Sequence, residues 1–500
     1  MIKNKRLWSL FAFTFLASCT VGPDYKQPRL YENEQIAASL ELSGGVRPVN
    51  KDWYRRFHDP LLDRLVAQSL KSSPDVKVGI QKLRQARDSL KIAAVGNLPM
   101  INADGSYHYN KPSKNIGYTI DTDYYQTGLD ASWELDIWGS GRRQTESAAA
   151  LFQAAAAGLD NVYLSITAEV AADYIGLRTS QAALDIAESN LKLQSDIFDL
   201  IKVKYDNGLV DTIAYNQAKY AVETTKALIP DLQSSIEAYK NALAILTGKL
   251  PGALNAELDG VDKNLVKRRF NYDLNQLYEL PVNVVRCRPD VKIAEMQLIS
   301  QNAQIGKALA ELFPNISLSG FLGFQSTKFS NLVGHDSYMY TYTPTITLPI
   351  LHWGQLLNNV ELQKNITKEY YYTYQKAVLN AASEIKNAMV SLSKEYDKNQ
   401  ASRGSVIAQK QIMTLTWDKY QQGLVDFSDV LTAERDLLAS QNALIASNGQ
   451  IYQDIIAFYK SVGGGYEPKS LRENINSPFL TDDNPCRQKQ CLKTAKNLPD

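Results

Sequence analysis

The sequence predicts an α+β membrane protein that combines short β-strands with very long helices, in a chain of 500 residues. Three observations predict this class. Residues 142–207 contain no proline, and their only glycines are Gly158 and Gly176. Four stretches of about ten residues alternate apolar and polar side chains. Landmarks of the first half recur in the second half at one constant spacing, which indicates an internal duplication.

The longest predicted element is a helical hairpin. Residues 142–207 are rich in Ala, Leu, Gln and Lys, which are good helix formers. Asp206-Asn207-Gly208 breaks this run, and residues 213–246 form a second helical run, so we expect two antiparallel helices. At 1.5 Å per residue the first helix would be ~100 Å long. A single globular core cannot bury such a length, so the hairpin must pack laterally against others like it.

The hairpin occurs twice. The segment 205–211, YDNGLVD, is matched by 420–426, YQQGLVD, at an offset of 215 residues. Pro-Asp-Val-Lys at 74–77 recurs at 289–292, and Trp-Gly at 138–139 recurs at 353–354, in the same register. Chance similarity between helices would not preserve several separated landmarks. The sequence therefore predicts two copies of one unit.

Four short strands are predicted, two in each copy. The apolar phase of the first two comprises Ile101, Ala103, Gly105, Tyr107 and Tyr109, then Tyr125, Thr127, Leu129, Ala131, Trp133 and Leu135. In the second copy it comprises Ile316, Leu318, Leu322 and Phe324, then Tyr340, Tyr342, Ile346, Leu348 and Ile350. These lengths suit membrane-spanning strands of ~9–11 residues. A soluble sheet with one wet face is the alternative, but aromatic residues near the strand ends and an export signal favour the membrane.

Four strands cannot close a barrel, because closure takes about eight or more. An open sheet edge in lipid would leave amides unpaired, at a cost of several kcal/mol each. The chain must therefore share one barrel with other copies. Two chains would supply eight strands and three would supply twelve.

Residues 1–18 read as a signal peptide, with Lys3, Lys5 and Arg6 before an apolar stretch too short to span a bilayer. The stretch 16–19, Leu-Ala-Ser-Cys, resembles the bacterial lipobox, which predicts a lipid on Cys19 as the first mature residue. An ordinary secretory signal followed by a plain cysteine is the alternative. In the pattern that the lipobox resembles, Thr20 in place of Asp favours the outer membrane.

Several segments outside the two repeats are predicted less sharply. Residues 53–70 resemble one short helix. Residues 249–288 and the polar tail after residue 463 are expected to pack as a belt outside the helices or to be partly disordered. Cys486 and Cys491 suit either a small disulfide or two free thiols. Cys287 is expected to be a lone buried thiol.

The sequence shows no pattern typical of a catalytic or metal-binding site. The four histidines, His58, His108, His335 and His352, share no metal-binding spacing. No catalytic triad order, phosphate-binding glycine loop or CxxC motif stands out. We therefore expect no enzyme activity, no metal, and no cofactor besides the covalent lipid on Cys19. The formal net charge of +1 gives no basis for nucleic-acid binding.

Together these landmarks resemble the TolC-type outer-membrane efflux factors, in the lipoprotein branch typified by OprM. The resemblance is carried by Cys19 with Val-Gly-Pro-Asp-Tyr at 21–25, Arg-Pro-Asp-Val at 288–291, Leu-Phe-Pro at 312–314 and the two Tyr-x-x-Gly turns. It implies a homotrimer in which a shared 12-stranded outer-membrane barrel is continued by a periplasmic α-helical barrel. It also implies a periplasmic adaptor protein and an inner-membrane efflux pump as partners. The chain would be a passive conduit for drugs or other toxic compounds.

The resemblance also implies a periplasmic gate around the second-repeat turn. Asp429 aligns with a gate aspartate of some members, and three copies would crowd their carboxylates around the axis. Helix capping is the alternative for Asp426 and Asp429. The remaining gate candidates are Tyr420, Thr432, where many members carry Asp, and Arg435 as a cationic partner. The residues expected to contact the adaptor are Asp206, Asn207, Gly208 and Gly423.

The predicted domains follow from the repeats. They are a signal peptide (1–18), an N-terminal linker and equatorial segment (19–73), the first repeat (74–248), an inter-repeat equatorial segment (249–288), the second repeat (289–463) and a C-terminal tail (464–500). Two other functions stay open on the sequence alone: the outer-membrane conduit of a type I protein secretion system, and a structural lipoprotein with a helical stalk.

Overall fold

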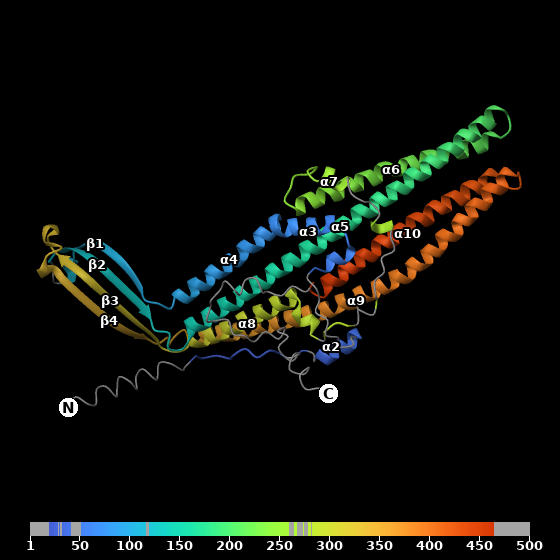
Figure 1. Cartoon of the computed structure of the whole chain (residues 1–500). Coiled ribbons are helices and arrows are strands. Elements are labelled where there is room, and N and C mark those ends of the chain that lie inside the picture. The colour runs from blue at the N-terminus through green and yellow to red at the C-terminus, as the bar shows by residue number, and fades with distance from the viewer. Residues whose placement is uncertain are drawn as a thin grey trace, which may run out of the picture. The chain divides into compact units, whose positions relative to one another are not determined.

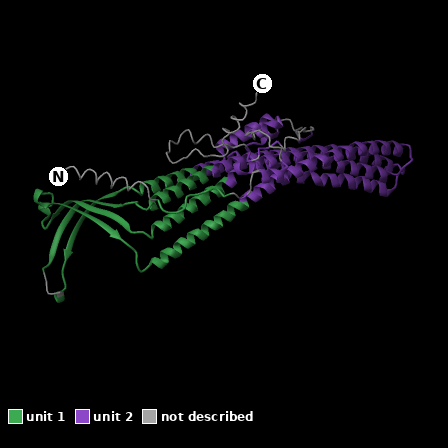
Figure 2. Cartoon of the chain, turned by 90° about the horizontal axis from the view of Figure 1, so that it is seen from below, with its two compact units in different colours: residues 1–29, 82–156, 292–376 green, residues 30–81, 157–291, 377–500 purple. Residues whose placement is uncertain are grey.

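The computed structural model describes residues 20–28, 30, 33–41, 52–116, 120–259, 265–267, 274, 279–281 and 283–464. It contains two compact units, each assembled from three separate stretches of the chain (Figure 2). Unit 1 comprises Met1–Arg29, Lys82–Ala156 and Lys292–Lys376. Unit 2 comprises Leu30–Gln81, Ala157–Val291 and Ala377–Asp500. Among the helices of the described residues, none is long and apolar enough to cross a bilayer.

Unit 1 contains one antiparallel sheet of four strands in the order β1-β2-β3-β4. The strands are β1 (Met100–Asn110), β2 (Thr122–Glu134), β3 (Asn315–Ser326) and β4 (Tyr338–Thr347). The predicted apolar phases lie on the same face, because Ala131 pairs with both Ile101 and Gly320, and Ile316 pairs with Ile346. The prediction of four alternating strands is confirmed, and within the described chain β1 and β4 are the two open edges of the sheet.

The sheet also confirms the duplication. Met100 pairs with Ser132 across β1 and β2, and Asn315 pairs with Thr347 across β3 and β4. Each residue of the second pair lies 215 positions after its counterpart in the first. The two hairpins of strands therefore have one register, although few positions in them are identical: Ile101, Gly105 and Tyr125 recur as Ile316, Gly320 and Tyr340.

The helical part of unit 1 is held by polar contacts between the repeats. α8 (Pro289–Ala310) packs against the start of α5 (Ser140–Asp206), where the hydroxyls of Ser147 and Ser300 lie 2.8 Å apart. Lys307 Nζ donates to Gln144 Oε1 at 3.0 Å. These contacts join residues about 150 positions apart in sequence, so the two repeats of one chain form a single packed unit here.

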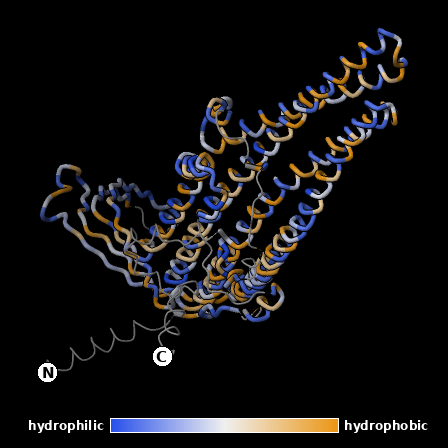
Figure 3. Tube along the Cα trace, turned by 45° about the vertical axis from the view of Figure 1, so that its right-hand side comes forward, coloured by the Kyte–Doolittle hydropathy of each residue, from blue (hydrophilic) through white to orange (hydrophobic). Residues whose placement is uncertain are grey.

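Two long hairpins, α5 with α6 (Thr212–Leu246) and α9 (Trp353–Gln421) with α10 (Phe427–Ser461), make up most of unit 2, which holds α5 from Ala157 and α9 from Ala377 onward. Within this unit the hairpins lie side by side with their turns at the same end (Figure 1). Apolar and polar residues alternate along all of these helices (Figure 3), and the buried positions are mostly small or aliphatic. α5 has 67 residues and α9 has 69, which confirms the predicted hairpins. α6 continues through Pro230.

The predicted single helix at 53–70 is wrong, because the chain breaks at residues 58–59. A 3-10 turn, η1 (Trp53–Phe57), is followed by α3 (Pro60–Ser72). Pro60 has no N–H to continue a helix, and Asp59 caps α3 by accepting from the N–H groups of Leu61 and Leu62. Pro at the first helical position after Asp is a helix-start signal that the apolar spacing obscured.

The remaining helices are short or flank the repeats. They are α2 (Asn33–Leu40), α4 (Pro74–Val95), η2 (Lys114–Ile116), α7 (Asn255–Asp259), η3 (Leu265–Lys267), η5 (Val284–Cys287), η6 (Phe329–Asn331) and η7 (His335–Ser337). In the inter-repeat segment, Val266 is fully buried and Lys267 Nζ lies 2.7 Å from an oxygen of Asp185 on α5. This part of the segment therefore packs on the helices, as one of the two alternatives predicted.

The expectation of a lone thiol at Cys287 is also wrong, because Cys287 is disulfide-bonded. The chain has only three other cysteines, Cys19, Cys486 and Cys491, and all three lie outside the described residues. The two alternatives for Cys486 and Cys491, a disulfide or two free thiols, and the order of the tail therefore fall outside the described residues as well. Spacing along the sequence could not reveal the bond at Cys287, because it joins distant segments.

Candidate functional site at the hairpin turns

The two hairpin turns end their first helices in the same way. Leu209 N–H donates to Lys204 C=O at 2.8 Å, and Leu424 N–H donates to Lys419 C=O at 2.9 Å. Gly208 and Gly423 lie in the left-handed region, with φ of +70° and +71°. This is the Schellman arrangement, in which glycine ends a helix without steric cost. The turns are therefore fixed by backbone hydrogen bonds, which explains why the two Tyr-x-x-Gly motifs lie at the same offset.

The aspartates after each turn cap the returning helices. Asp211 Oδ1 accepts from Ala214 N–H at 2.9 Å, at the start of α6. In the second hairpin, Asp429 Oδ2 accepts from Asp426 N–H at 3.3 Å, the reciprocal half of a capping box. Asp429, a predicted gate residue, therefore also holds the start of α10, and its carboxylate has a defined position.

Three other predicted gate residues, Asp426, Thr432 and Arg435, are exposed in the chain. Asp429, Thr432 and Asp436 recur at helical spacing on one stripe, and each is exposed. Thr432 Oγ1 donates to Ser428 C=O at 2.8 Å. Arg435 Nη2 lies 3.2 Å from Asp436 Oδ1, so within one chain the predicted cationic partner of Asp429 pairs with a different carboxylate.

A hydrophobic cluster joins the two hairpins close to their turns. Its buried members are Ile197, Ile201, Ala218, Phe427 and Val430, which come from α5, α6 and α10. Tyr420 packs against this cluster, with its ring 5.6 Å from that of Phe427. Lys204 of α5 places Nζ 5.0 Å from the centre of the Tyr420 ring. Tyr420, predicted as a gate residue, is thus part of the contact between the hairpins.

Sequence reasoning missed a buried acid next to this cluster. Glu434 of α10 is only 2% exposed, and Gln194 of α5 donates a hydrogen bond to it. Burial raises the pKa of Glu434 from 4.5 to about 7, against a smaller lowering by Gln194. Glu434 lies four residues after Val430 and seven after Phe427, which places it on the buried stripe of α10. Helical spacing was therefore the available signal, and the charge of the side chain obscured it.

The first turn presents the residues predicted to contact the adaptor. Asp206, Asn207 and Gly208 are exposed, as is Gly423 of the second turn. Asn207 Nδ2 donates to Val203 C=O at 2.7 Å, so this side chain also helps to end α5.

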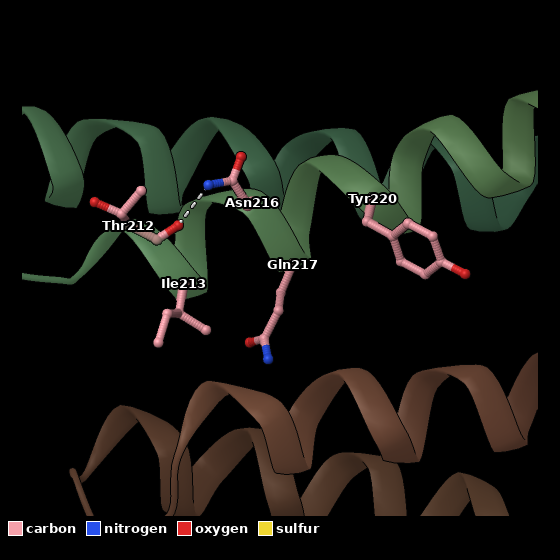
Figure 4. A pocket seen from close by; sticks show the side chains of 5 residues that line it. All are labelled: Thr212, Ile213, Asn216, Gln217 and Tyr220. Atoms are coloured by element: carbon pink, nitrogen blue, oxygen red, sulfur yellow. Dashed lines mark hydrogen bonds between the residues drawn. The ribbon is translucent and has the colours of Figure 1, made fainter.

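An open pocket lies on α6 just after the first turn. It has a volume of about 390 Å³ and is lined by Thr212, Ile213, Asn216, Gln217 and Tyr220. Figure 4 shows Ile213, Gln217 and Tyr220 pointing to the same side of α6. Ile213 is 65% exposed and Tyr220 is 73% exposed, so the surface next to the first turn is amphipathic.

The Val-Gly-Pro-Asp-Tyr segment is bound to unit 1. The buried Arg143 donates to Val21 C=O at 3.2 Å, to Gly22 C=O at 3.1 Å and to Asp24 Oδ1 at 2.9 Å. A Cβ on Gly22 would clash with the Cα of Gly306, so the close approach of the two backbones requires glycine. Val21 N–H donates to Trp138 C=O at 3.0 Å, which places the start of this segment a few residues beyond the end of β2.

A family model described as outer membrane efflux protein matches this chain twice, over residues 65–249 and 280–464. The second match begins and ends 215 residues after the first, which is the offset of the duplication. The two matches together cover more than half of the chain.

Known relatives cover the chain almost completely. The nodulation protein T of Rhizobium leguminosarum bv. trifolii is 29% identical over 92% of this chain and 97% of its own length. The cation efflux system protein CusC of Escherichia coli K12 is 27% identical over 90% and 97%. The toluene efflux pump outer membrane protein TtgC of Pseudomonas putida is 28% identical over 96% and 99%. These relatives do not favour the alternative of a protein secretion conduit.

Solved structures of outer-membrane channels match the fold of this chain. The outer-membrane channel OprN matches with a TM-score of 0.81 and 30% identity, over 89% of this chain and 99% of that one. The structure of CusC matches with a TM-score of 0.76 and 25% identity, over 89% and 100%. The predicted fold of a trimeric channel with four strands per chain is thereby confirmed, as are its outer-membrane location and the class of its partners, a periplasmic adaptor and an inner-membrane pump. The protein is a channel and not an enzyme. The chain belongs to the outer membrane efflux protein family.

Proposed function

We propose that three copies of this chain form a passive export path for small molecules, and that the turns of the second repeat narrow its periplasmic end. The observation that supports the proposal is the division of α10 into two faces. Phe427 and Val430 are buried in the cluster between the hairpins, whereas Asp429, Thr432 and Asp436 are exposed on the opposite stripe. In a closed ring of hairpins, the exposed stripe is available to line the axis.

Asp429 is the candidate with the best-defined position. Its hydrogen bond to Asp426 N–H holds the carboxylate near the start of α10. Three such carboxylates around one axis repel one another and attract cations, so they would favour cations in a narrow passage. Arg435 would partly neutralise the negative charge of Asp436 in the same chain, since Nη2 of Arg435 lies 3.2 Å from Oδ1 of Asp436.

Single-channel recording in planar bilayers tests this gate. Asp429→Asn removes the charge while keeping an oxygen that can accept the capping hydrogen bond, so it should raise conductance and weaken cation block. Asp206→Asn makes the same change of charge at the first-repeat turn and should leave conductance and cation block unchanged. Equal conductance of the wild type and Asp429→Asn would remove Asp429 from the gate.

We propose in addition that Cys19 carries the lipid anchor. The support is the docking of the segment that follows it, since Val21 is bound to Trp138 and Gly139 leaves room for Thr20 only because it has no Cβ. A lipid on residue 19 would then be tethered close to the end of β2, near the membrane boundary. Intact mass spectrometry of the mature protein should show the mass of a lipidated N-terminus, and Cys19→Ser should abolish it.

We further propose that Asp206, Asn207, Gly208 and Gly423 contact the adaptor, together with the amphipathic surface of Ile213 and Tyr220. The exposure of these residues in the described chain supports this. Tyr220→Ala should weaken co-purification of the adaptor, and unchanged recovery would exclude this surface. We also propose that the chain divides into two repeats, at 74–248 and 289–463, with the remaining segments outside them.

A further inference from the structure

The sheet leaves two edges open in the described chain, and the shared barrel requires each edge to pair with a neighbouring chain. β1 and β4 are the edges, and they are antiparallel to each other because all three pairings inside the chain are antiparallel. The interchain seam therefore joins β4 of one chain to β1 of the next. Its register is not given by any pairing within one chain, but the duplication supplies it.

The duplication acts on the sheet as a constant shift of 215 residues. The pairs of the β1–β2 seam reappear in the β3–β4 seam after this shift, as Met100 with Ser132 becomes Asn315 with Thr347. The β2–β3 seam joins the second strand of one repeat to the first strand of the other. In the shared barrel, the seam between β4 and the neighbouring chain's β1 is equivalent to the β2–β3 seam. Here β4 corresponds to β2, and β1 corresponds to β3.

We propose that the interchain seam has the register of the β2–β3 seam carried over by the duplication. In β2–β3, Ala131 pairs with Gly320 and Asp130 pairs with Phe321. Moving the β2 residue forward by 215 and the β3 residue back by 215 gives the interchain pairs. Ile346 then lies opposite Gly105 of the neighbouring chain, and Thr345 lies opposite Ser106 of that chain. The inference rests on the shared barrel and adds which residues meet at its seam.

The phase of the side chains supports this register independently. Residues directly opposite one another point to the same face of a sheet. The proposed register places Tyr342 and Ile346, from the apolar phase of β4, opposite Tyr109 and Gly105, from the apolar phase of β1. A slip by one residue would place an apolar phase against a polar phase along the entire seam. Only slips by an even number of residues keep the faces matched, so the competing registers are two residues away.

The alternation of backbone hydrogen bonds fits as well. Leu135 N–H donates to Ile316 C=O, its opposite residue, at 2.9 Å, which fixes the alternation through the sheet. Successive residues of a strand direct their N–H groups to opposite sides, so this bond and the strand pairings determine the direction of every N–H group in the sheet. The even-numbered residues of β4 and the odd-numbered residues of β1 direct theirs toward the neighbouring chain. The proposed register pairs even with odd along the whole seam, as these amides require. Pro344 is even-numbered, so its missing N–H costs no bond inside the chain. It removes one of the hydrogen bonds at the seam.

Disulfide trapping in the assembled protein tests the register. Thr345 and Ser106 would form a non-hydrogen-bonded pair, with Cα atoms ~4.5 Å apart, within the range for a disulfide. The double variant Ser106→Cys/Thr345→Cys should give covalent trimers on a non-reducing denaturing gel. Reductant should return them to single chains, and each single variant should match the wild type.

Two double variants serve as matched controls. Ser106→Cys/Thr343→Cys and Ser106→Cys/Thr347→Cys shift the pair by two residues, to a separation of ~7–8 Å that a disulfide does not span. Stronger trapping in either one would overturn the register in favour of that slip. Absence of trapping in all three, in protein that still runs as a trimer in detergent, would overturn the pairing of β4 with β1. Conductance of the reduced variants reports on the export path separately, so a failed gate and a failed register are distinguishable.

Discussion

Gln194 of α5 and Glu434 of α10 form a buried polar pair in which Gln194 donates a hydrogen bond. Among the described residues, the Oε1 atom of each side chain is buried without a hydrogen-bond partner. The pair lies where the two hairpins pack together, and burial raises the pKa of Glu434 to about 7. The charged residues on the adjacent turns are all exposed, namely Lys192, Asp196, Lys410, Arg435 and Asp436. Burial, and not a neighbouring charge, therefore sets the ionisation of Glu434.

The first prediction concerns pH. Glu434 ionises near 4.5 when unfolded and near 7 when folded, so its contribution to stability is complete below about 4.5 and is lost as pH rises through 7. The loss amounts to ~3 kcal/mol, at about 1.36 kcal/mol per pKa unit. Glu434→Gln should flatten this dependence in thermal unfolding between about pH 5 and pH 8. Asp436→Asn, at an exposed site, should retain it, and an unaltered pH dependence in Glu434→Gln would show that another group is responsible.

The second prediction concerns the contact between Lys204 and Tyr420. A cation over an aromatic ring contributes ~0.5–1 kcal/mol at a partly exposed site. Lys204→Ala should therefore loosen the hairpin ends slightly, and Tyr420→Ala should loosen them more because it also removes packing on Phe427. Amide hydrogen exchange at the turns would show this as faster exchange. Lys202→Ala, at an exposed neighbouring site, serves as the control and should leave exchange unchanged.

The third prediction concerns Arg288, which lies at the opening of the second repeat. It donates to Ser461 C=O at 2.6 Å and to both oxygens of Asp290, and it also reaches Glu384. Burial alone would raise the pKa of Asp290, but the hydrogen bonds and charge of Arg288 outweigh burial and hold that pKa below its ordinary value. Arg288→Ala should lower the free energy of unfolding by ~2–3 kcal/mol, because Glu384 and Asp290 are partly exposed and water compensates them in part.

Arg288→Lys separates geometry from charge. Lysine keeps the charge but cannot make the bidentate contact with Asp290, so it should recover only part of the stability. Chemical denaturation of the two variants beside the wild type provides the comparison. Full recovery by lysine would mean that charge alone matters at this position.

The fourth prediction concerns glycine. Gly22 has φ +100° and lies against the backbone of Gly306, so Gly22→Ala should displace the N-terminal segment and expose residues 20–28 to proteolysis. At Gly404 of α9, a Cβ would have no atom of the described chain within 4 Å apart from the neighbouring residues and backbone of its own helix. Gly404→Ala should therefore stabilise the helix by ~0.5–1 kcal/mol. Protease resistance of Gly22→Ala equal to that of the wild type would contradict the tight docking.

Much of the fold could be predicted because its signals are local and repeated. The long runs between Ser140 and Asp206 and between Trp353 and Gln421 contain no proline and only isolated glycines, and the alternation in the strands is regular. The break at Asp59-Pro60 was missed because apolar spacing continued across it. The bond at Cys287 depends on segments far apart in the chain, where periodicity carries no information. Glu434 has the spacing of the buried stripe of α10, but a carboxylate at such a position is not expected to be buried. Tyr420 was placed at the gate by resemblance, and only the packing reveals its contact with Lys204.

One chain carries only part of a pore, and three chains complete it. Native mass spectrometry of the full-length protein, purified in detergent, measures this most directly. A single species with three times the mass of one chain is expected. A stable monomer, with the edges of β1 and β4 accessible to water-soluble thiol reagents in cysteine-substituted variants, would contradict the shared barrel.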